Sequence, residues 1–161
     1  MTEFYAQPYS IEHTGFYFDS VETFKTGMER LKKKGCEEVE IQFIESDDHL
    51  ATLAKYADAS QSDIDFWFEN LEDLEPENVI RLCYLLDQGL DIESALEHTD
   101  AVCLYHGTAE DYAQEIIEET TDIPENLRAY IDYNAIARDM KLSGEIVEIE
   151  HALIVTNALE F

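Results

Sequence analysis

Basic residues are scarce in this sequence, and features that mark several protein classes are missing. Lys and Arg number 10 in 161 residues, against 37 Asp and Glu, so the formal net charge is −27 at pH 7. Such a surface repels nucleic acid and anionic membranes. No apolar run approaches the roughly 18 residues of a membrane span, and the stretch MTEFYAQPYS lacks the pattern of a signal peptide. We therefore expect a cytoplasmic protein that binds neither nucleic acid nor membrane.

Cysteine and histidine are also few and dispersed. Cys36, Cys83 and Cys103 are an odd number at wide spacing, which fits neither a disulfide framework nor a CxxC metal site, so we expect buried thiols. No HExxH or HxxxH pair and no GxSxG, GxGxxG or GxxxxGK motif is present. We predict no catalytic residue, no metal ligand and no cofactor. An acid-rich enzyme with a weak cation site at Asp47 and Asp48 is the weaker alternative.

What the sequence does contain is enough apolar material for a packed core. Hydrophobic residues make up 45% of the chain and aromatic residues 11%, so this is not a disordered acidic tail. Self-repulsion at a net charge of −27 costs stability, which indicates that the negative charge has a function. A basic protein is the natural partner.

Apolar periodicity predicts an α+β fold made of three small subdomains in succession. Residues 1–45 have the pattern of a small antiparallel sheet with one helix, which begins after Ser20 and stops at Gly35. Residues 46–100 are helical almost throughout. One predicted stripe in this middle part consists of Val79, Leu82, Cys83 and Leu86.

The final part, residues 101–161, is predicted to mix strands and helices and to contain the functional motif. A strand within AVCLYHG precedes an acidic helix that Thr108 caps together with Asp111. One or two strands close the chain after residue 145. The acidic helix presents carboxylates opposite its apolar stripe.

The basic residues are unevenly distributed. Five of the ten lie on the first predicted helix or at its end, namely Lys25, Arg30, Lys32, Lys33 and Lys34. Duplex DNA has one negative charge per about 1.7 Å of axis, and a helix rises about 1.5 Å per residue. Acid-rich helices can therefore imitate a phosphate backbone. A solvated acidic face, or salt adaptation, is the alternative.

The segment LRAYIDYNAIARDM, residues 127–140, has the pattern of two short helices around a small core. Leu127, Tyr130 and Ile131 form one apolar stripe, and a second stripe begins at Tyr133. Asp132 lies between the stripes, where a helix cap is expected. The pattern predicts a helical hairpin with a capped second arm.

The same segment resembles the C-terminal signature of the ArdA-type antirestriction proteins, within IPENLRAYIDYNAIARDM. Two N-terminal stretches, AQPYSIEHTGFYFDSVETF and CEEVEIQFIESDD, also look like an ArdA-like subgroup. The matching signature positions are Leu127, Tyr130, Asp132, Tyr133, Ala137, Arg138, Asp139 and Met140.

This resemblance implies an elongated, three-part, non-catalytic DNA mimic that forms a homodimer. Such proteins occupy the DNA-binding groove of type I restriction-modification enzymes, in their methyltransferase core, and protect incoming mobile DNA. The resemblance implies a mimic surface made by Glu110, Asp111, Glu115, Glu118, Glu119, Asp122 and Glu125. The signature residues would hold that surface in place or form a subunit contact, with Arg138 in a structural role. An acidic adaptor or chaperone-like module that binds another basic protein remains the alternative.

Overall fold

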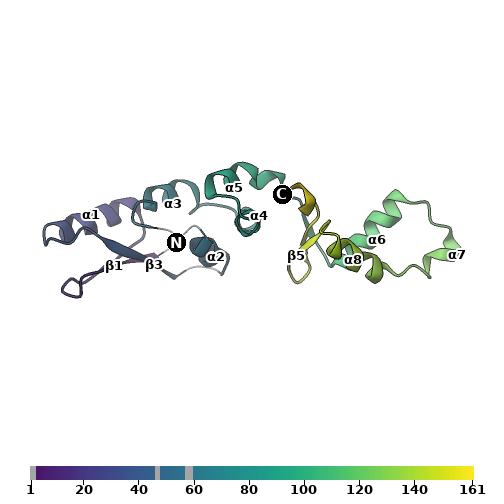
Figure 1. The fold of residues 1–161 in the computed structure, drawn as a ribbon, viewed down its shortest axis with the longest axis horizontal. Coiled ribbons are helices and arrows are strands. Elements are labelled where there is room, and N and C mark those ends of the chain that lie inside the picture. The colour runs from purple at the N-terminus through teal and green to yellow at the C-terminus, as the bar shows by residue number, and fades with distance from the viewer. Residues whose placement is uncertain (1–2, 46–47, 57–59) are drawn as a thin grey trace. The chain divides into compact units, whose positions relative to one another are not determined.

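Figure 1 shows a computed structural model of the chain, which describes residues 3–45, 48–56 and 60–161. The fold is mixed α+β, as predicted, because these residues form eight α-helices and two three-stranded antiparallel sheets. The chain divides into two compact units, Met1–Asp87 and Gln88–Phe161. The division into three subdomains stays a prediction.

The first unit contains an antiparallel sheet in the strand order β2-β1-β3. Its strands are β1 (Glu3–Pro8), β2 (Phe16–Phe18) and β3 (Val39–Glu45). Phe4 lies opposite Phe18 on one side and opposite Phe43 on the other. Phe4 and Ala6 are buried while their neighbours in β1 are only half-buried. This alternation is that of a strand with one face on the core.

Helix α1 (Val21–Lys32) begins and ends where the sequence predicted. The Ser20 Oγ accepts the backbone N–H of Thr23 at 3.3 Å, and the Thr23 Oγ1 accepts the backbone N–H of Ser20 at 3.1 Å. This reciprocal cap satisfies two of the donors that a helix start leaves unpaired. Gly35 follows the helix with a φ of +86°, a conformation that glycine adopts without strain.

An aromatic cluster joins this sheet to helix α3 (Ile64–Asn70). The Phe4 ring stacks on Phe18 with centroids 5.3 Å apart, and meets Phe43 and Trp67 edge-on at 5.1 and 5.4 Å. These separations and angles are the favourable ones for aromatic pairs. The cluster forms part of the core of the first unit, which also contains Leu53, Leu82 and Leu85.

Helices α2 (Asp48–Tyr56) and α4 (Pro76–Asp87) pack against each other in the same unit. The predicted stripe on α4 is partly wrong, because Cys83 and Leu86 are only half-buried. The residues that α4 buries are Val79, Leu82, Tyr84 and Leu85. Helix α4 ends as predicted before Gly89, which has a φ of +94°.

The second unit consists of short helices and a sheet in the order β4-β6-β5. The central strand β6 is buried at all three positions, and Leu104 and Val147 both lie opposite Val155. The predicted strand after residue 101 and the closing strands are confirmed. The elements are α5 (Ile92–His98), η1 (Thr99–Ala101), β4 (Leu104–His106), α6 (Ala109–Thr120), α7 (Glu125–Arg128), α8 (Tyr133–Leu142), β5 (Val147–Glu150), β6 (Leu153–Val155) and η2 (Ala158–Glu160).

The predicted hairpin of residues 127–140 is only half correct. The second arm is α8, but the first arm, α7, is a single turn of four residues. Leu127 and Tyr130 are 50% and 84% exposed, and only Ile131 of the predicted stripe is half-buried. Helix α8 pairs with α6 instead, and Figure 1 shows α7 in the connection between these two helices.

Candidate functional site

Helix α6 begins in a capping box that Thr108 and Asp111 form, as the sequence predicted. The Asp111 N–H donates to the Thr108 Oγ1 at 3.2 Å, and the Thr108 N–H and hydroxyl donate to the Asp111 carboxylate at 3.0 and 2.6 Å. Donation from Thr108 holds the pKa of the Asp111 carboxyl below its usual range. A carboxylate in the first turn also complements the helix dipole. Asp111 is therefore a structural anion at the start of the acidic helix.

Small residues bring α6 and α8 close together. Ala109 and Ala113 on α6 are buried, and so is Ala137 on α8. These alanines share a core with Ile146 and Ile154, against which Tyr112 and Met140 also pack. Because both helices present alanine at the contact, their backbones can approach closely, and α8 supports α6 from behind.

Two tyrosine hydroxyls hold carboxylates of α6. The Tyr105 Oη donates to Glu115 at 2.8 Å, and the Tyr133 Oη donates to Glu118 at 3.1 Å. The hydrogen bond to Glu115 raises the pKa of Tyr105 to about 12, since ionisation would place two negative charges together. Desolvation and the bond to Glu118 raise the pKa of Tyr133. Both bonds restrict the carboxylates to defined positions while leaving them charged.

Glu118 has three partners among the described residues, of which the Tyr133 hydroxyl is one. The Gln114 Nε2 donates to Glu118 at 3.0 Å, and the Arg128 guanidinium lies 3.8 Å away. The side chain keeps 29% of its exposure. Part of the charge of Glu118 is therefore balanced within the protein, and Arg128 links α7 to α6.

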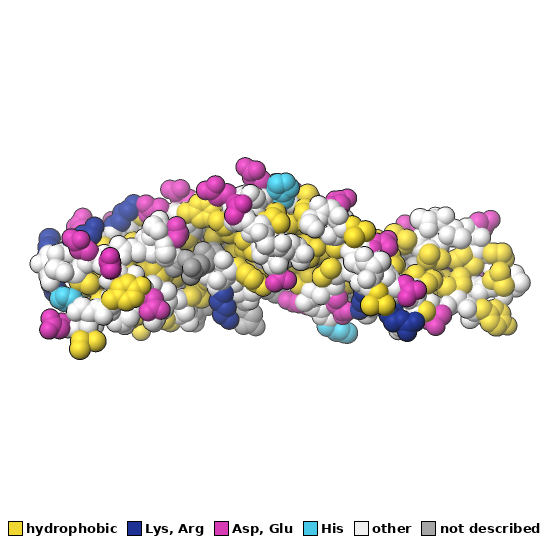
Figure 2. All heavy atoms as spheres, in the orientation of Figure 1, with side chains coloured by type: hydrophobic (Ala, Val, Ile, Leu, Met, Phe, Trp, Pro, Cys, Tyr) yellow, Lys and Arg dark blue, Asp and Glu magenta, His cyan; other side chains and the backbone are white. Residues whose placement is uncertain are grey.

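The remaining predicted acidic positions are exposed and available. Glu119, Asp122 and Glu125 form no hydrogen bond or ion pair through their side chains with any residue the structure describes. Glu110 accepts one long hydrogen bond, from the Asn134 Nδ2 at 3.4 Å. Figure 2 shows acidic side chains spread over the visible face of both units, whereas Lys and Arg gather at a few places. We call the seven predicted positions from Glu110 to Glu125 the acidic surface. Its carboxylates differ in the number of contacts that hold them in place.

The signature residues separate into two groups. The Asp132 Oδ1 accepts the Ala135 N–H at 2.9 Å, which confirms the predicted cap of α8. Tyr133 and Met140 contribute to the packing of α8, in addition to the buried Ala137. Leu127, Tyr130, Arg138 and Asp139 are instead exposed.

Arg138 lines a hollow between the start of α6 and α8, with Glu110, Asn134, Lys141 and Glu148 on its walls. Arg138 is exposed and forms no ion pair within the described ranges. Lys141 pairs with Glu148, which lowers the pKa of that carboxyl. A structural role for Arg138 therefore stays a prediction, and no intramolecular ion pair supports it.

The cysteine prediction is wrong for one of the three thiols. Cys36 is buried and Cys83 is half-buried, and burial raises the pKa of Cys83 to about 11. Cys103 is exposed; it directly precedes the edge strand β4, and its backbone N–H donates to the Asn157 Oδ1 at 2.9 Å. A thiol in a strand-like sequence can lie on the buried or the exposed face, and the sequence pattern did not distinguish these two faces.

The sequence patterns did not indicate the partners that orient the carboxylates. The spacing of Gln114 and Glu118, four residues apart on one helix, is a signal that could have indicated their contact. Tyr105 reaches Glu115 only because the sheet places β4 beside α6, and no local pattern encodes that contact.

The predicted weak cation site at Asp47 and Asp48 lies outside the described part of the chain. Asp47 is not among the described residues, and the side chain of Asp48 is not described. Elsewhere in the described chain, no three His, Cys, Asp or Glu side chains gather in a way that could hold a metal ion. None of the described helices is long and apolar enough to cross a membrane.

The fold and charge define an acidic α+β protein that presents an exposed, capped and carboxylate-rich helix. The family model described as "Antirestriction protein (ArdA)" matches residues 3–155, and the chain therefore belongs to the ArdA family of antirestriction proteins. The resemblance found in the signature is thus confirmed. A comparison with curated proteins finds no match. Family membership implies antirestriction activity, which acts on restriction-modification systems.

Proposed function

We propose that this protein is a non-catalytic DNA mimic, whose acidic surface occupies the DNA-binding groove of a type I restriction-modification enzyme. The observation that supports the proposal most strongly is the exposed run Glu119, Asp122 and Glu125, which has no cationic partner in the described chain. Unpaired charges cost a folded protein self-repulsion, and a partner rich in Lys and Arg would relieve that cost.

The spacing of charge along α6 supports mimicry of a phosphate backbone. The 12 residues of α6 span about 18 Å. Five carboxylates on this length give one charge per about 3.6 Å, close to the 3.4 Å per phosphate of one DNA strand. The five are Glu110, Asp111, Glu115, Glu118 and Glu119. Asp122 and Glu125 continue the row beyond the helix.

The fixed positions of several carboxylates favour binding over loose attraction. Thr108 holds Asp111, Tyr105 holds Glu115, and Tyr133 holds Glu118. Side chains that are ordered before binding lose less conformational freedom on binding. The enzyme's Lys and Arg residues would meet carboxylates in place of phosphates, and both surfaces would release counterions.

We further propose that the exposed part of the signature contacts another protein chain. Leu127 and Tyr130 are large apolar side chains that the fold leaves in solvent beside the acidic surface. Tyrosine is enriched at protein interfaces, because it buries much area and still offers a hydroxyl. A second copy of this chain is the occupant we favour, in line with the homodimer that the family resemblance implies. Sedimentation of Tyr130→Ala, with a lower fraction of dimer than the native protein, would support this contact.

A cluster of substitutions tests the mimic surface. The test variant combines Glu115→Gln, Glu119→Gln, Asp122→Asn and Glu125→Gln, and inhibition of a purified type I enzyme's DNA binding is titrated. Glutamine keeps an acceptor for Tyr105, so the fold is preserved while four charges are removed. We expect the inhibitory concentration to rise by about tenfold or more, since single exposed charges act weakly but clusters add up.

The matched control removes four exposed carboxylates of the first unit. It combines Glu12→Gln, Glu29→Gln, Glu37→Gln and Asp73→Asn, whose side chains are all exposed. Both variants lose four negative charges, so a general effect of net charge would weaken them equally. Equal loss would refute the assignment of the surface to α6. Recovery of a basic partner unrelated to restriction, with no inhibition by the native protein, would favour the acidic adaptor.

A further inference from the structure

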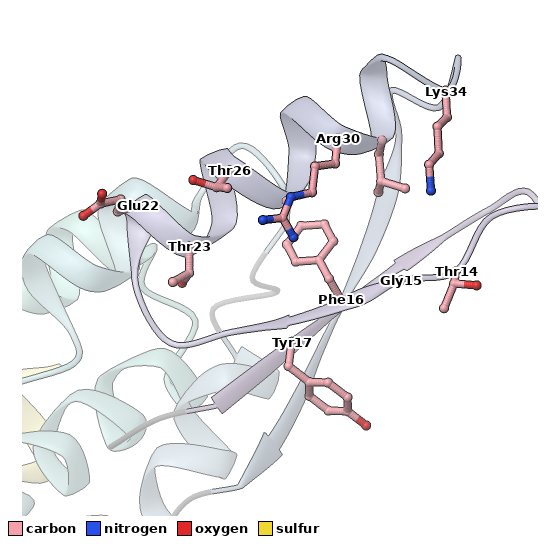
Figure 3. A pocket seen from close by; sticks show the side chains of 11 residues that line it. Thr14, Gly15, Phe16, Tyr17, Glu22, Thr23, Thr26, Arg30 and Lys34 are labelled. Atoms are coloured by element: carbon pink, nitrogen blue, oxygen red, sulfur yellow. The ribbon is translucent and has the colours of Figure 1, made fainter.

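A groove of about 520 Å³ lies between helix α1 and the chain segment that leads into β2. In Figure 3, Arg30 from the last turn of α1 and Lys34 from the turn after it extend toward the segment that contains Gly15 and Phe16. Glu22 lies at the opposite end of the helix. The groove therefore has a cationic end, on a chain whose net charge is −27.

Two glycines shape the walls of this groove. A Cβ atom on Gly27 would lie 2.2 Å from the Phe16 ring, so the ring rests directly on the backbone of α1. A Cβ atom on Gly15 would lie 2.2 Å from the carbonyl oxygen of Ala6, so this segment lies flat against β1. The groove is built by close packing and does not depend on flexible surface side chains alone.

One wall of the groove is the edge of a sheet. The strand order β2-β1-β3 leaves β2 at an edge, and no described strand pairs with its outer side. An edge strand offers main-chain donors and acceptors to a further strand. Addition of an extended peptide beside such a strand is a recurrent mode of peptide binding.

The two cations of the groove have no partner within the described chain. Arg30 and Lys34 are exposed and form no ion pair there, although carboxylates outnumber cations 37 to 10. On the same helix, Lys25 pairs with Asp65 at 3.1 Å. Arg30 and Lys34 thus remain available for an anion from another molecule.

We propose that this groove binds an extended acidic segment of a partner protein, in which two carboxylates are separated by one residue. Lys34 follows Arg30 by four residues and lies in the turn directly after α1, so both cations lie at the same end of the groove. Alternate residues of an extended strand are about 6.6 Å apart and point to the same side. A Glu-x-Glu segment added beside β2 therefore presents two carboxylates on one side, toward the cationic end of the groove.

The binding of a labelled peptide to the full-length protein tests this inference. The probe is an extended Glu-Thr-Glu peptide, and fluorescence anisotropy is measured at low salt. The first comparison peptide has the same composition with adjacent glutamates, and the second has N-methylated backbone amides. We expect both to bind about threefold to tenfold more weakly, because one loses the charge spacing and the other the main-chain donors.

Charge reversal provides the matched pair of variants. Arg30→Glu with Lys34→Glu alters the groove, and Lys32→Glu with Lys33→Glu makes the same change of charge on exposed positions nearby that do not line it. We expect about a tenfold loss of peptide affinity for the groove variant and less than about a threefold loss for its control. Circular dichroism establishes that both variants are folded.

Several outcomes would overturn the inference. Equal losses of peptide affinity for the two variants would show that the peptide binds by non-specific charge attraction. Failure of the native protein to bind the peptide would exclude an acidic segment. Tighter binding of a single-stranded oligonucleotide than of the peptide would assign the groove to nucleic acid. A concentration-dependent self-association that only Arg30→Glu with Lys34→Glu abolishes would make a second copy of this chain the occupant.

Discussion

Replacing Asp132 with alanine removes the cap of α8, and we expect it to destabilise the second unit. The Asp132 carboxylate accepts the Ala135 N–H at 2.9 Å, and alanine leaves that donor without its partner. Loss of such a cap typically costs about 1 kcal/mol, within a range of about 0.5–2 kcal/mol. Because α8 packs against α6, the lost hydrogen bond destabilises the packing beneath the acidic surface as well as α8 itself.

Thermal unfolding measures this effect. The second unit spans Gln88–Phe161, and for a domain of that size about 1 kcal/mol lowers the melting temperature by about 4–8 °C. Circular dichroism at the helix band follows the transition. Inhibitory activity measured well below the melting temperature should be unchanged, since Asp132 acts on stability.

Asp139→Ala is the control for the charge that the substitution removes. Asp139 is exposed, lies in the same helix and forms no side-chain hydrogen bond with the described residues. It lies near the C-terminal end of α8, where a negative charge opposes the helix dipole, so its removal should leave the melting temperature equal or higher. An Asp132→Ala protein as stable as Asp139→Ala would refute the capping argument.

Three further predictions concern helix packing, tyrosine ionisation and thiol exposure. Ala113 is fully buried between α6 and α8, so Ala113→Leu forces extra volume into this contact. The substitution should lower the free energy of unfolding, measured by urea denaturation, by about 1–3 kcal/mol. An unchanged free energy of unfolding would contradict the close packing of the two helices. The Tyr105 phenol should ionise at about pH 12, above the ordinary value of 10.0, so its neutral form contributes stability that is lost as pH rises between these values. Spectrophotometric titration should lose this late step in Tyr105→Phe but keep it in Tyr133→Phe. A thiol-specific reagent should modify Cys103 quickly and the other two thiols slowly in the native protein, and equal rates would contradict their difference in exposure.

Local patterns predicted the ends of the helices well. Ser20, Thr108 and Asp132 cap α1, α6 and α8, and glycines with positive φ follow α1 and α4. Caps depend on hydrogen bonds between residues about three apart, so the sequence alone contains the information needed to place them.

Packing between distant segments could not be predicted in the same way. The apolar stripe of Leu127 and Tyr130 suggested a buried helix face, yet α7 forms one turn and both side chains are exposed. The spacing of apolar residues along a helix does not indicate whether another element of the fold packs against them. The exposed Cys103 has the same explanation, because its burial depends on which face of the unit its segment presents.

The candidate site was predicted as a set of residues but not as an arrangement. The signature and the density of carboxylates located it, and the family match supports the signature. The division between carboxylates that the protein holds, such as Glu115, and carboxylates without partners, such as Glu119, depends on the placement of Tyr105 and Tyr133. That placement is set by the sheet and by α8, which no short stretch of sequence encodes.

Displacement of DNA from a type I methyltransferase core tests the central claim most directly. The purified protein is titrated against the enzyme bound to a labelled duplex, at low and at moderate salt, with a known inhibitor in parallel. DNA mimicry predicts displacement near stoichiometry at low salt, and weaker displacement as salt screens the exposed carboxylates. A duplex that stays bound at every salt concentration while the known inhibitor displaces it would contradict the mimicry of DNA by this acidic surface.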